Sequence, residues 1–420
     1  MKKPVIRLTA AFLATVILAV LLLLLGACLP QEPIDANVLK SAEKMVQQGD
    51  YPVMADHSFA SILDYFTDSL ILAESKATTI SQWETIFTNP LYQHGDRTLV
   101  EHLYNYAQNS DLEPTKFYTQ YWMGFRPIMR LMLSFLDYYQ ILRYVALGFF
   151  VLFTAAICSV SKHTNAKTAF LFALSIIFVR PHVIAVSLQF SFVFLIAFGA
   201  MLLVPWIHKH PKWESLFFLE LGIVTMYFDF YTVPFVTFGL PMIYLYLLRE
   251  QDGHHIGVKQ VLKSTMLWGI GYVGMWIAKL LLTSLLTPAS GLGTGFTAFA
   301  ERIGITKMAG FESYYNPMKS LYTVALSLFS DEQGKLMLAL AIVVTFACLF
   351  IRFLRVKPGI RQFFRHIELV IIAMIPVIWF MVAAQPTANH HWFQYRSIAV
   401  SFWAGFAYLQ YLLKAPTVSK

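Results

Sequence analysis

The sequence has few charged residues and few cysteines, and both shortages limit the class of protein. Only 13% of the 420 residues are charged and 57% are hydrophobic, whereas a soluble domain carries about 25% charged residues. Such a chain cannot cover a soluble fold with polar side chains, so the composition indicates an integral membrane protein. No pair among the three cysteines suggests a disulfide or a zinc site.

The positions of the cysteines carry separate expectations. Cys158 and Cys348 lie inside apolar runs, where a cysteine usually acts as a small buried hydrophobic residue. Cys28 ends the sequence Leu25-Gly26-Ala27-Cys28, which resembles a lipoprotein processing site. The apolar stretch before it is longer than the core of a usual signal peptide. We therefore expect an uncleaved first transmembrane helix, and lipidation of Cys28 stays an open alternative.

Long apolar runs recur along the chain and predict an all-α integral membrane protein with about ten transmembrane helices. The expected segments are 8–28, 138–160, 168–180, 183–206, 215–231, 233–249, 264–286, 337–353, 367–384 and 395–413. The third and fifth segments are short, so the number of transmembrane helices could differ from ten by one or two. Short segments also fit tilted, broken or re-entrant helices.

The net charge of +8 at first suggests nucleic acid as a partner, but the positions of the charges argue against it. With ten helices, nearly all loop lysines and arginines fall on one side of the membrane, and no basic stripe alternates with aromatic residues. These residues are Lys2, Lys3, Arg7, Lys162, Lys167, Lys209, Lys212, Arg249, Lys259, Lys263, Arg352, Arg355, Lys357, Arg361, Arg365, Lys414 and Lys420. The positive-inside rule then places both termini in the cytoplasm.

The same topology divides the chain into three parts. Residues 1–28 form the first transmembrane helix, residues 29–137 a large extracellular helical loop, and residues 138–420 a multi-helix transmembrane domain with a second outer loop at 287–336. The unusual polar residues gather in the outer loops and turns. We therefore expect the active face of this cell-membrane protein to be extracellular.

Two carboxylates in the first outer loop are the candidate catalytic residues. Apolar side chains from Phe59 to Leu70 recur at helical spacing and predict an amphipathic helix over Asp56 to Glu74. Asp64 and Asp68 lie four residues apart on its other face. One interpretation is that both are solvated surface residues. The other is that one of them is a general base beside a cleft, and each carboxylate would then raise the pKa of the other.

Cations on the outer side run against the general charge trend and are candidates for binding a lipid phosphate. Arg126 and Arg130 lie four residues apart ahead of the second helix, and either snorkel to headgroups or bind phosphate. Arg180 and His182 lie in the turn between the third and fourth helices. Asp229 ends the fifth helix among aromatic residues, where a carboxylate needs a partner: an arginine, a substrate hydroxyl or a metal ion.

The last candidate cluster precedes the tenth helix, in the sequence Asn389-His390-His391-Trp392-Phe393-Gln394-Tyr395-Arg396. Adjacent histidines point to different faces of a helix, so we predict no metal site here. His390, His391, Tyr395 and Arg396 are instead candidates for binding a phosphate or pyrophosphate. His254-His255 lies in a polar cytoplasmic loop and is expected to be solvated.

A cytoplasmic N-terminus, one helix, a long outer loop with an acidic residue and then many helices together resemble the GT-C superfamily of membrane glycosyltransferases. The segments Phe66-Thr67-Asp68-Ser69, Phe228-Asp229-Phe230 and His391-Trp392-Phe393-Gln394-Tyr395-Arg396 also resemble those of uncharacterised multi-pass proteins of Gram-positive bacteria. The first resemblance implies a polyprenyl-phosphate sugar as donor and a cell-envelope glycan, glycolipid or protein as acceptor. It maps the catalytic acid to Asp64 or Asp68 and leaves a divalent metal cofactor open.

Two other classes of function remain as alternatives. A lipid or solute transporter, or flippase, would carry charged residues midway through its helices, and Lys279 is the clear candidate. A non-catalytic scaffold of the cell envelope would need no acid and phosphate-binding residues. The outer location of the candidate residues favours the glycosyltransferase as the prediction from sequence.

Overall fold

The computed structural model describes residues 2–54, 59–77, 81–229, 231–303, 305, 316–328 and 332–414, and these are mostly helical. Each of the ten predicted segments coincides with a helix. These helices are α1 (Lys2–Ala27), α7 (Tyr138–His163), α8 (Ala166–Ile177), α10 (Leu188–Lys209), α11 (Glu214–Phe228), α12 (Phe235–Gln251), α13 (Val258–Leu286), α16 (Glu332–Val356), α18 (Ile367–Val382) and α21 (Ile398–Leu412).

Four helices within the described residues are long and apolar enough to cross a membrane: α1 from Val5, α7, α10 and α13. The prediction of a helical membrane protein is therefore confirmed at this level. Helices α8 and α18 are apolar but have only 12 and 16 residues. A helix rises about 1.5 Å per residue, so 12 residues cover about 18 Å of a hydrocarbon core of about 30 Å. The count of ten spans stays a prediction.

The long helices turn apolar side chains outward, as expected where lipid is the solvent. On α1, Leu13, Ile17 and Leu25 are exposed, and on α7 Leu147 and Val151 are exposed. Cys158 was expected to be buried, but it lies on this outward face of α7 and is exposed. An apolar run in a membrane helix therefore does not imply burial in protein.

Helices α11 and α13 approach each other closely because glycines lie at their contact. A Cβ atom added to Gly222 of α11 would lie 2.0 Å from the backbone oxygen of Trp268. One added to Gly271 of α13 would lie 2.1 Å from the oxygen of Leu219. Small residues permit such backbone contact between membrane helices, which gain stability from close packing.

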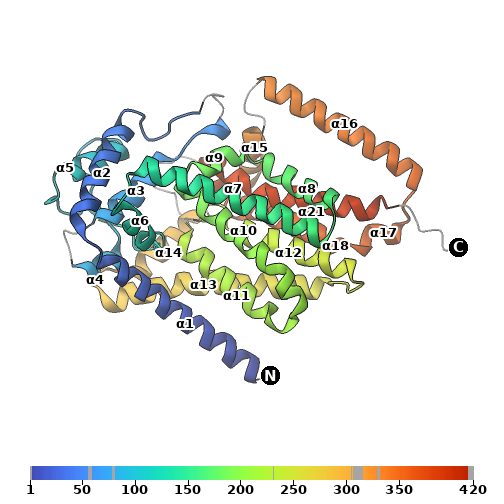
Figure 1. Cartoon of the computed structure of the whole chain (residues 1–420), viewed down its shortest axis with the longest axis horizontal. Helices are drawn as coiled ribbons and strands as arrows, with labels where there is room; N and C mark the ends of the chain where they lie inside the picture. Colours follow the sequence, from blue (N-terminus) through green and yellow to red (C-terminus); the bar gives the residue numbers. More distant parts are fainter. Residues whose placement is uncertain are drawn as a thin grey trace.

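Residues 29–137 form a helical layer, here called the cap, over one end of the long helices (Figure 1). It has its own apolar core, built around Ile34, Val38, Tyr106 and Leu133. Its elements are α2 (Gln31–Val46), the 3₁₀-helix η1 (Phe59–Ser61), α3 (Tyr65–Lys76), α4 (Gln82–Thr88), β1 (Pro90–Leu91), α5 (Leu99–Gln108), β2 (Lys116–Phe117) and α6 (Arg126–Leu133). The two short strands pair antiparallel.

The helix predicted over Asp56 to Glu74 is shorter in the structure. Residues 55–58 lie outside the described part, and α3 begins at Tyr65. Asp64 is its N-cap, because the side chain accepts a hydrogen bond from the Thr67 amide. An aspartate in this position satisfies one of the amides that a helix start leaves free.

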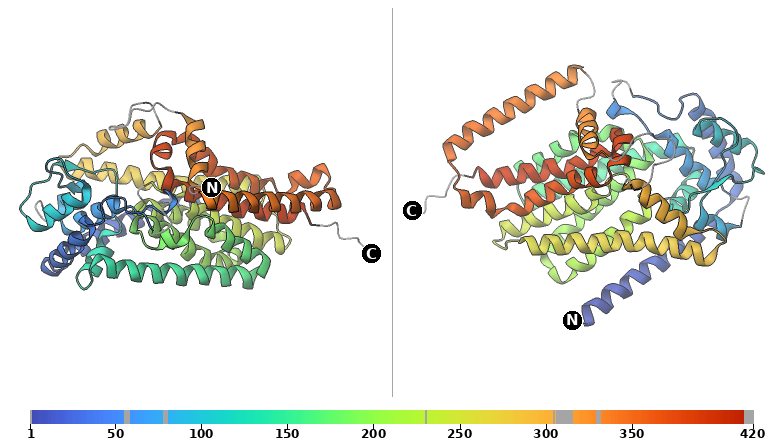
Figure 2. Two further views of the ribbon diagram at one scale, coloured as in Figure 1. Left: turned by 90° about the horizontal axis from the view of Figure 1, so that it is seen from above. Right: turned by 180° about the vertical axis from the view of Figure 1, so that it is seen from behind.

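Shorter elements connect the long helices. They are α9 (Pro181–Ala185), the 3₁₀-helix η2 (Pro211–Trp213), α14 (Gly291–Arg302), α15 (Pro317–Leu328), α17 (Ile360–Arg365), α19 (Ala384–Asn389), α20 (His391–Gln394) and the 3₁₀-helix η3 (Tyr395–Ser397). The predicted loop 287–336 thus contains α14 and α15. Helix α16 stands apart from the other long helices in Figure 1 and in the right-hand view of Figure 2. Arg352 near its end donates a hydrogen bond to the Leu413 carbonyl.

Candidate functional site

A cavity of about 120 Å³ lies between the cap and the helices beneath it. Its lining combines residues of the cap, of α10, of the connection from α11 to α12, of α14 and of the segment from α18 to α20. The polar members include Asp64, Arg302 and His390. The phenylalanine, tyrosine and tryptophan members are Tyr51, Phe66, Tyr118, Tyr121, Tyr231, Trp379, Trp392 and Phe393. A few polar groups converge there among aromatic walls, which is the usual composition of a small-molecule site.

Asp64 is the one carboxylate among the described residues that line this cavity. It is only 2% exposed, and its two oxygens accept hydrogen bonds from the amide and hydroxyl of Thr67, at 3.0 and 2.8 Å. Burial raises the pKa of Asp64 to about 6, although the Thr67 hydrogen bonds favour the ionised form. The Asp50 carboxylate adds a smaller increase. A carboxylate with this pKa is ionised at neutral pH and still basic enough to accept a proton.

Asp68 has a different environment, although it is also buried. Its carboxylate accepts hydrogen bonds from the Tyr138 hydroxyl at 2.5 Å and from the amides of Leu188 and Gln189, at 3.1 and 3.2 Å. These two amides open α10, so Asp68 joins α3 to α7 and α10. The sequence left Asp64 and Asp68 as equal candidates, and the structure brings only Asp64 to the cavity.

Arg302 is a cavity residue that the sequence analysis did not select. It ends α14, its guanidinium lies 4.4 Å from the centre of the Tyr231 ring, and its Nη2 donates to the Tyr121 hydroxyl at 2.8 Å. These two contacts of the guanidinium are with an aromatic ring and a tyrosine hydroxyl, and neither is with a carboxylate. The signal that would have found it is the one used for Arg126: a cation on the predicted outer side.

The adjacent histidines have separate positions, as their spacing predicted. His390 lines the cavity and stacks on Phe393, and burial lowers its pKa to about 4, so the imidazole is neutral. His391 points elsewhere, and its Nδ1 shares a hydrogen bond of 2.7 Å with the hydroxyl of Ser327 on α15. Of the two, His390 alone is placed to contact a ligand in the cavity.

Arg396 and Tyr395 lie behind the cavity wall. Arg396 is fully buried, donates to the carbonyls of Ala60 and Trp392 at 3.0 and 3.1 Å, and lies over the Phe190 ring. The Tyr395 hydroxyl donates to the Val179 carbonyl. These contacts attach the start of α21 to η1 and to the end of α8.

Arg126 and Arg130 lie inside the cap, away from the cavity lining. Arg130 donates to the carbonyls of Gly26, Ser75 and Leu29 and to the Gln31 side chain. Arg126 is 1% exposed and interacts electrostatically with the buried carboxylate of Glu74. Both residues lie in α6, and their phosphate-binding role stays a prediction that these contacts do not favour.

The remaining predicted residues lie outside the cavity lining as well. Arg180 donates to the Ser61 hydroxyl at 2.5 Å, and His182 is exposed. Asp229 accepts hydrogen bonds from the amide and hydroxyl of Thr232 and from the Tyr272 hydroxyl, while its neighbour Phe230 lies outside the described residues. The contacts of Arg180 and Asp229 explain their burial or their place in a turn.

The cavity therefore joins one ionisable carboxylate, one arginine and one neutral imidazole within a largely aromatic wall. This set can accept a proton, hold an anion and pack against the apolar face of a ring-shaped ligand. Comparison of the chain with known protein families, with curated proteins and with solved structures finds no match.

Proposed function

We propose that this protein is a membrane glycosyltransferase that moves a sugar from a polyprenyl-phosphate donor to a cell-envelope acceptor. The observation that carries the proposal is the cavity that joins Asp64 and Arg302 among aromatic side chains. In the proposed topology about ten helices cross the membrane, both termini are cytoplasmic and the cavity opens on the outer face. The GT-C resemblance and the distribution of loop charges support that orientation.

Each part of the cavity has a role in the proposed reaction. The sugar packs against the tyrosine and tryptophan rings, which offer apolar area together with hydroxyl and N–H groups. Arg302 binds the donor phosphate, for which its planar guanidinium offers paired donors. As the bond between the anomeric carbon and the phosphate oxygen breaks, the electron pair leaves with the phosphate, and Arg302 offsets that charge.

Asp64 acts on the acceptor in this mechanism. An acceptor hydroxyl attacks the anomeric carbon, and the ionised carboxylate takes its proton as the new C–O bond forms. The buried position of Asp64 and its two hydrogen bonds to Thr67 hold the carboxylate in one orientation. The products are the glycosylated acceptor and the polyprenyl phosphate.

The transporter alternative depended on Lys279 in the middle of α13. This side chain is fully buried, its Nζ donates to the Ile86 carbonyl at 2.9 Å, and it lies against the rings of Phe87 and Trp122. Lys279 thus joins α13 to α4 of the cap. These contacts favour a structural role for this lysine, so the glycosyltransferase remains the function that we propose.

Binding of polyprenyl phosphate tests the proposed donor site. We expect Arg302→Ala to weaken binding by about 10-fold to 100-fold, since a charge-assisted contact contributes about 1.5–3 kcal/mol. Arg302→Lys should retain part of the affinity because it keeps the charge but not the paired donors. The measurement is a titration of the purified protein with the lipid, followed by native mass spectrometry.

The matched control is Arg97→Ala, which removes an exposed arginine of the cap. This variant should bind the lipid as the unchanged protein does. Equal binding by the Arg302→Ala variant would reject Arg302 as the phosphate ligand. No binding by any variant, or lipid density far from the cavity by cryo-electron microscopy, would favour the transporter or the scaffold.

The pH dependence of transfer tests the proposed base. Only the ionised carboxylate of Asp64 accepts a proton, and burial raises its pKa to about 6. The rate constant should therefore be nearly constant above pH 7 and fall about 10-fold per pH unit below pH 6. A rate that stays level between pH 5 and pH 8 would contradict the assignment.

A further inference from the structure

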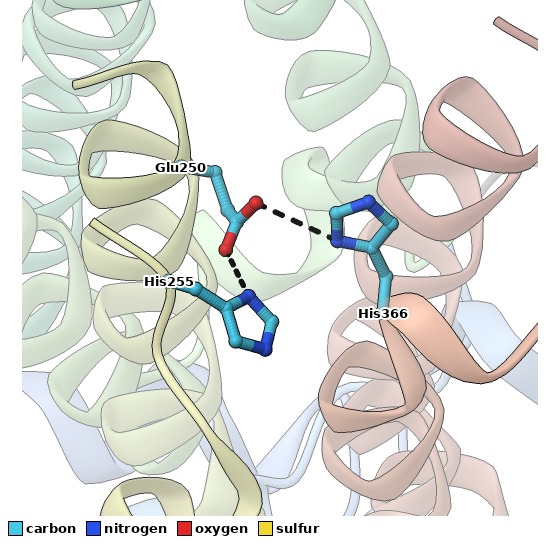
Figure 3. A group of neighbouring side chains, drawn as sticks. All are labelled: Glu250, His255 and His366. Carbon is cyan, nitrogen blue, oxygen red and sulfur yellow. Dashed lines mark hydrogen bonds and ion pairs between the residues drawn. The ribbon is translucent and has the colours of Figure 1, made fainter. Parts of the chain in front are cut away.

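A second group of polar residues lies at the end of the long helices opposite the cap, and Figure 3 shows three of its members. Glu250 lies in the last turn of α12, His255 in the segment that leads to α13, and His366 directly before α18. His255 was expected to be solvated. Its side chain is 47% exposed, as expected, and it also contacts the Glu250 carboxylate.

The geometry of the three side chains suits one metal ion. Glu250 Oε1 contacts His255 Nδ1, and Glu250 Oε2 lies 3.7 Å from His366 Nδ1. One ligand atom from each residue lies within 4.8 Å of the others. Bonds of about 2.1 Å to a tetrahedral ion place ligand atoms about 3.4 Å apart. Small side-chain rotations would therefore bring the three atoms to coordination distance.

A fourth residue, Glu368, lies beside the group and has a buried carboxylate oxygen without a hydrogen-bond partner in the described part of the chain. Glu368 is 4% exposed, its Oε1 lies 3.5 Å from His255 Nε2, and its Oε2 has no hydrogen-bond donor among the described residues. Arg249 is bound to Glu214 at 2.6 Å. Arg365, which acts electrostatically on His366, donates no hydrogen bond to this oxygen of Glu368. Two carboxylates beside two imidazoles leave a buried oxygen unpaired, which is costly unless a cation or donor is present.

We propose that Glu250, His255 and His366 bind a divalent transition-metal ion, most favourably Zn²⁺. Carboxylate oxygen and imidazole nitrogen are the ligand types that zinc prefers, and three protein ligands leave a fourth position for water. Glu368 would accept the Nε2–H of His255 and so present Nδ1 to the ion, the usual arrangement around metal-bound histidines. The Tyr246 hydroxyl, now 2.7 Å from His366 Nδ1, would turn to the bound water.

Such an ion would join the end of α12 to the start of α18, at the end of the long helices away from the cap (Figure 1). The site does not depend on the proposed glycosyltransferase reaction. Its effect would be on the stability of this end of the helices, because a ligand that binds the folded state shifts unfolding toward higher temperature.

Metal content and thermal stability test the proposal directly. Full-length protein is purified without a metal-affinity step, incubated with ZnCl₂, desalted and analysed by inductively coupled plasma mass spectrometry. We expect about one zinc per chain, and a fall in Tm of about 5 °C when a chelator removes it. The His255→Ala and His366→Gln variants should retain little zinc and show no response to the chelator.

The control is His254→Ala, which removes the exposed neighbour of His255 and should bind zinc as the unchanged protein does. Because His255 is half-exposed, the His255→Ala variant should fold even if a change at the buried His366 does not. The proposal is overturned if the unchanged protein retains no zinc. It is equally overturned if the His255→Ala variant retains as much zinc as the His254→Ala control.

Discussion

Replacement of Asp64 by Asn should reduce sugar transfer by about 10²-fold to 10⁴-fold, the usual contribution of a general base. The amide cannot accept the proton of the acceptor hydroxyl. Its oxygen still accepts the hydrogen bond from the Thr67 amide, and asparagine is as good an N-cap as aspartate. The fold and the binding of the lipid donor should therefore be preserved. Transfer is measured from a panel of radiolabelled polyprenyl-phosphate sugars to membranes that lack the protein.

The control for this experiment is Asp96→Asn, which neutralises an exposed carboxylate of the cap. It should retain full transfer activity. The role of Asp64 as the base would be rejected if its Asn variant transferred sugar at the normal rate. If it lost both transfer and donor binding while its Tm was unchanged, Asp64 would instead be a residue that binds the donor.

The Arg130→Met variant should lose about 3–5 kcal/mol in the free energy of unfolding, the range for breaking a buried charged network. The guanidinium of Arg130 donates to the carbonyls of Gly26, Leu29 and Ser75, at 2.8, 3.2 and 2.6 Å. These acceptors lie at the end of α1, just after it and in α3, so one side chain attaches the cap to the first helix. Methionine fills similar space but leaves the carbonyls without a donor.

Thermal unfolding of the purified protein in detergent measures this effect. Arg143→Met, which changes an exposed arginine of α7, should leave the Tm nearly unchanged. If the Arg130→Met variant instead had a normal Tm but bound polyprenyl phosphate weakly, Arg130 would have the phosphate-binding role predicted from sequence. The Arg302→Ala variant should have a normal Tm and weak binding of polyprenyl phosphate, because Arg302 lies in the cavity.

The sequence predicted the helical membrane class, and each of the ten apolar segments overlaps a helix of the structure over most of its length. This success has a local cause. A helix satisfies its backbone hydrogen bonds within one segment, so an apolar run of sufficient length is enough to indicate it. The helical cap and the helix at Arg126 and Arg130 could be predicted for the same reason.

The membership of the candidate site depended on contacts between distant segments. Asp64 and Asp68 look equivalent in sequence, but Asp68 caps the start of α10 and Asp64 faces the cavity. Arg302 shares the cavity wall with Asp64, although no motif links the two residues. Spacing along a helix specifies a shared face, but not what packs against that face.

The sequence by itself determined that the chain is a helical membrane protein, because burial of apolar runs and backbone hydrogen bonding are local properties. Tertiary structure alone decided which polar groups meet. It selected Asp64, His390 and Arg302 for one cavity, and brought Glu250, His255 and His366 together at the other end. Burial and the direction of each side chain depend on the whole packing of the helices, so no short stretch of sequence contains that information.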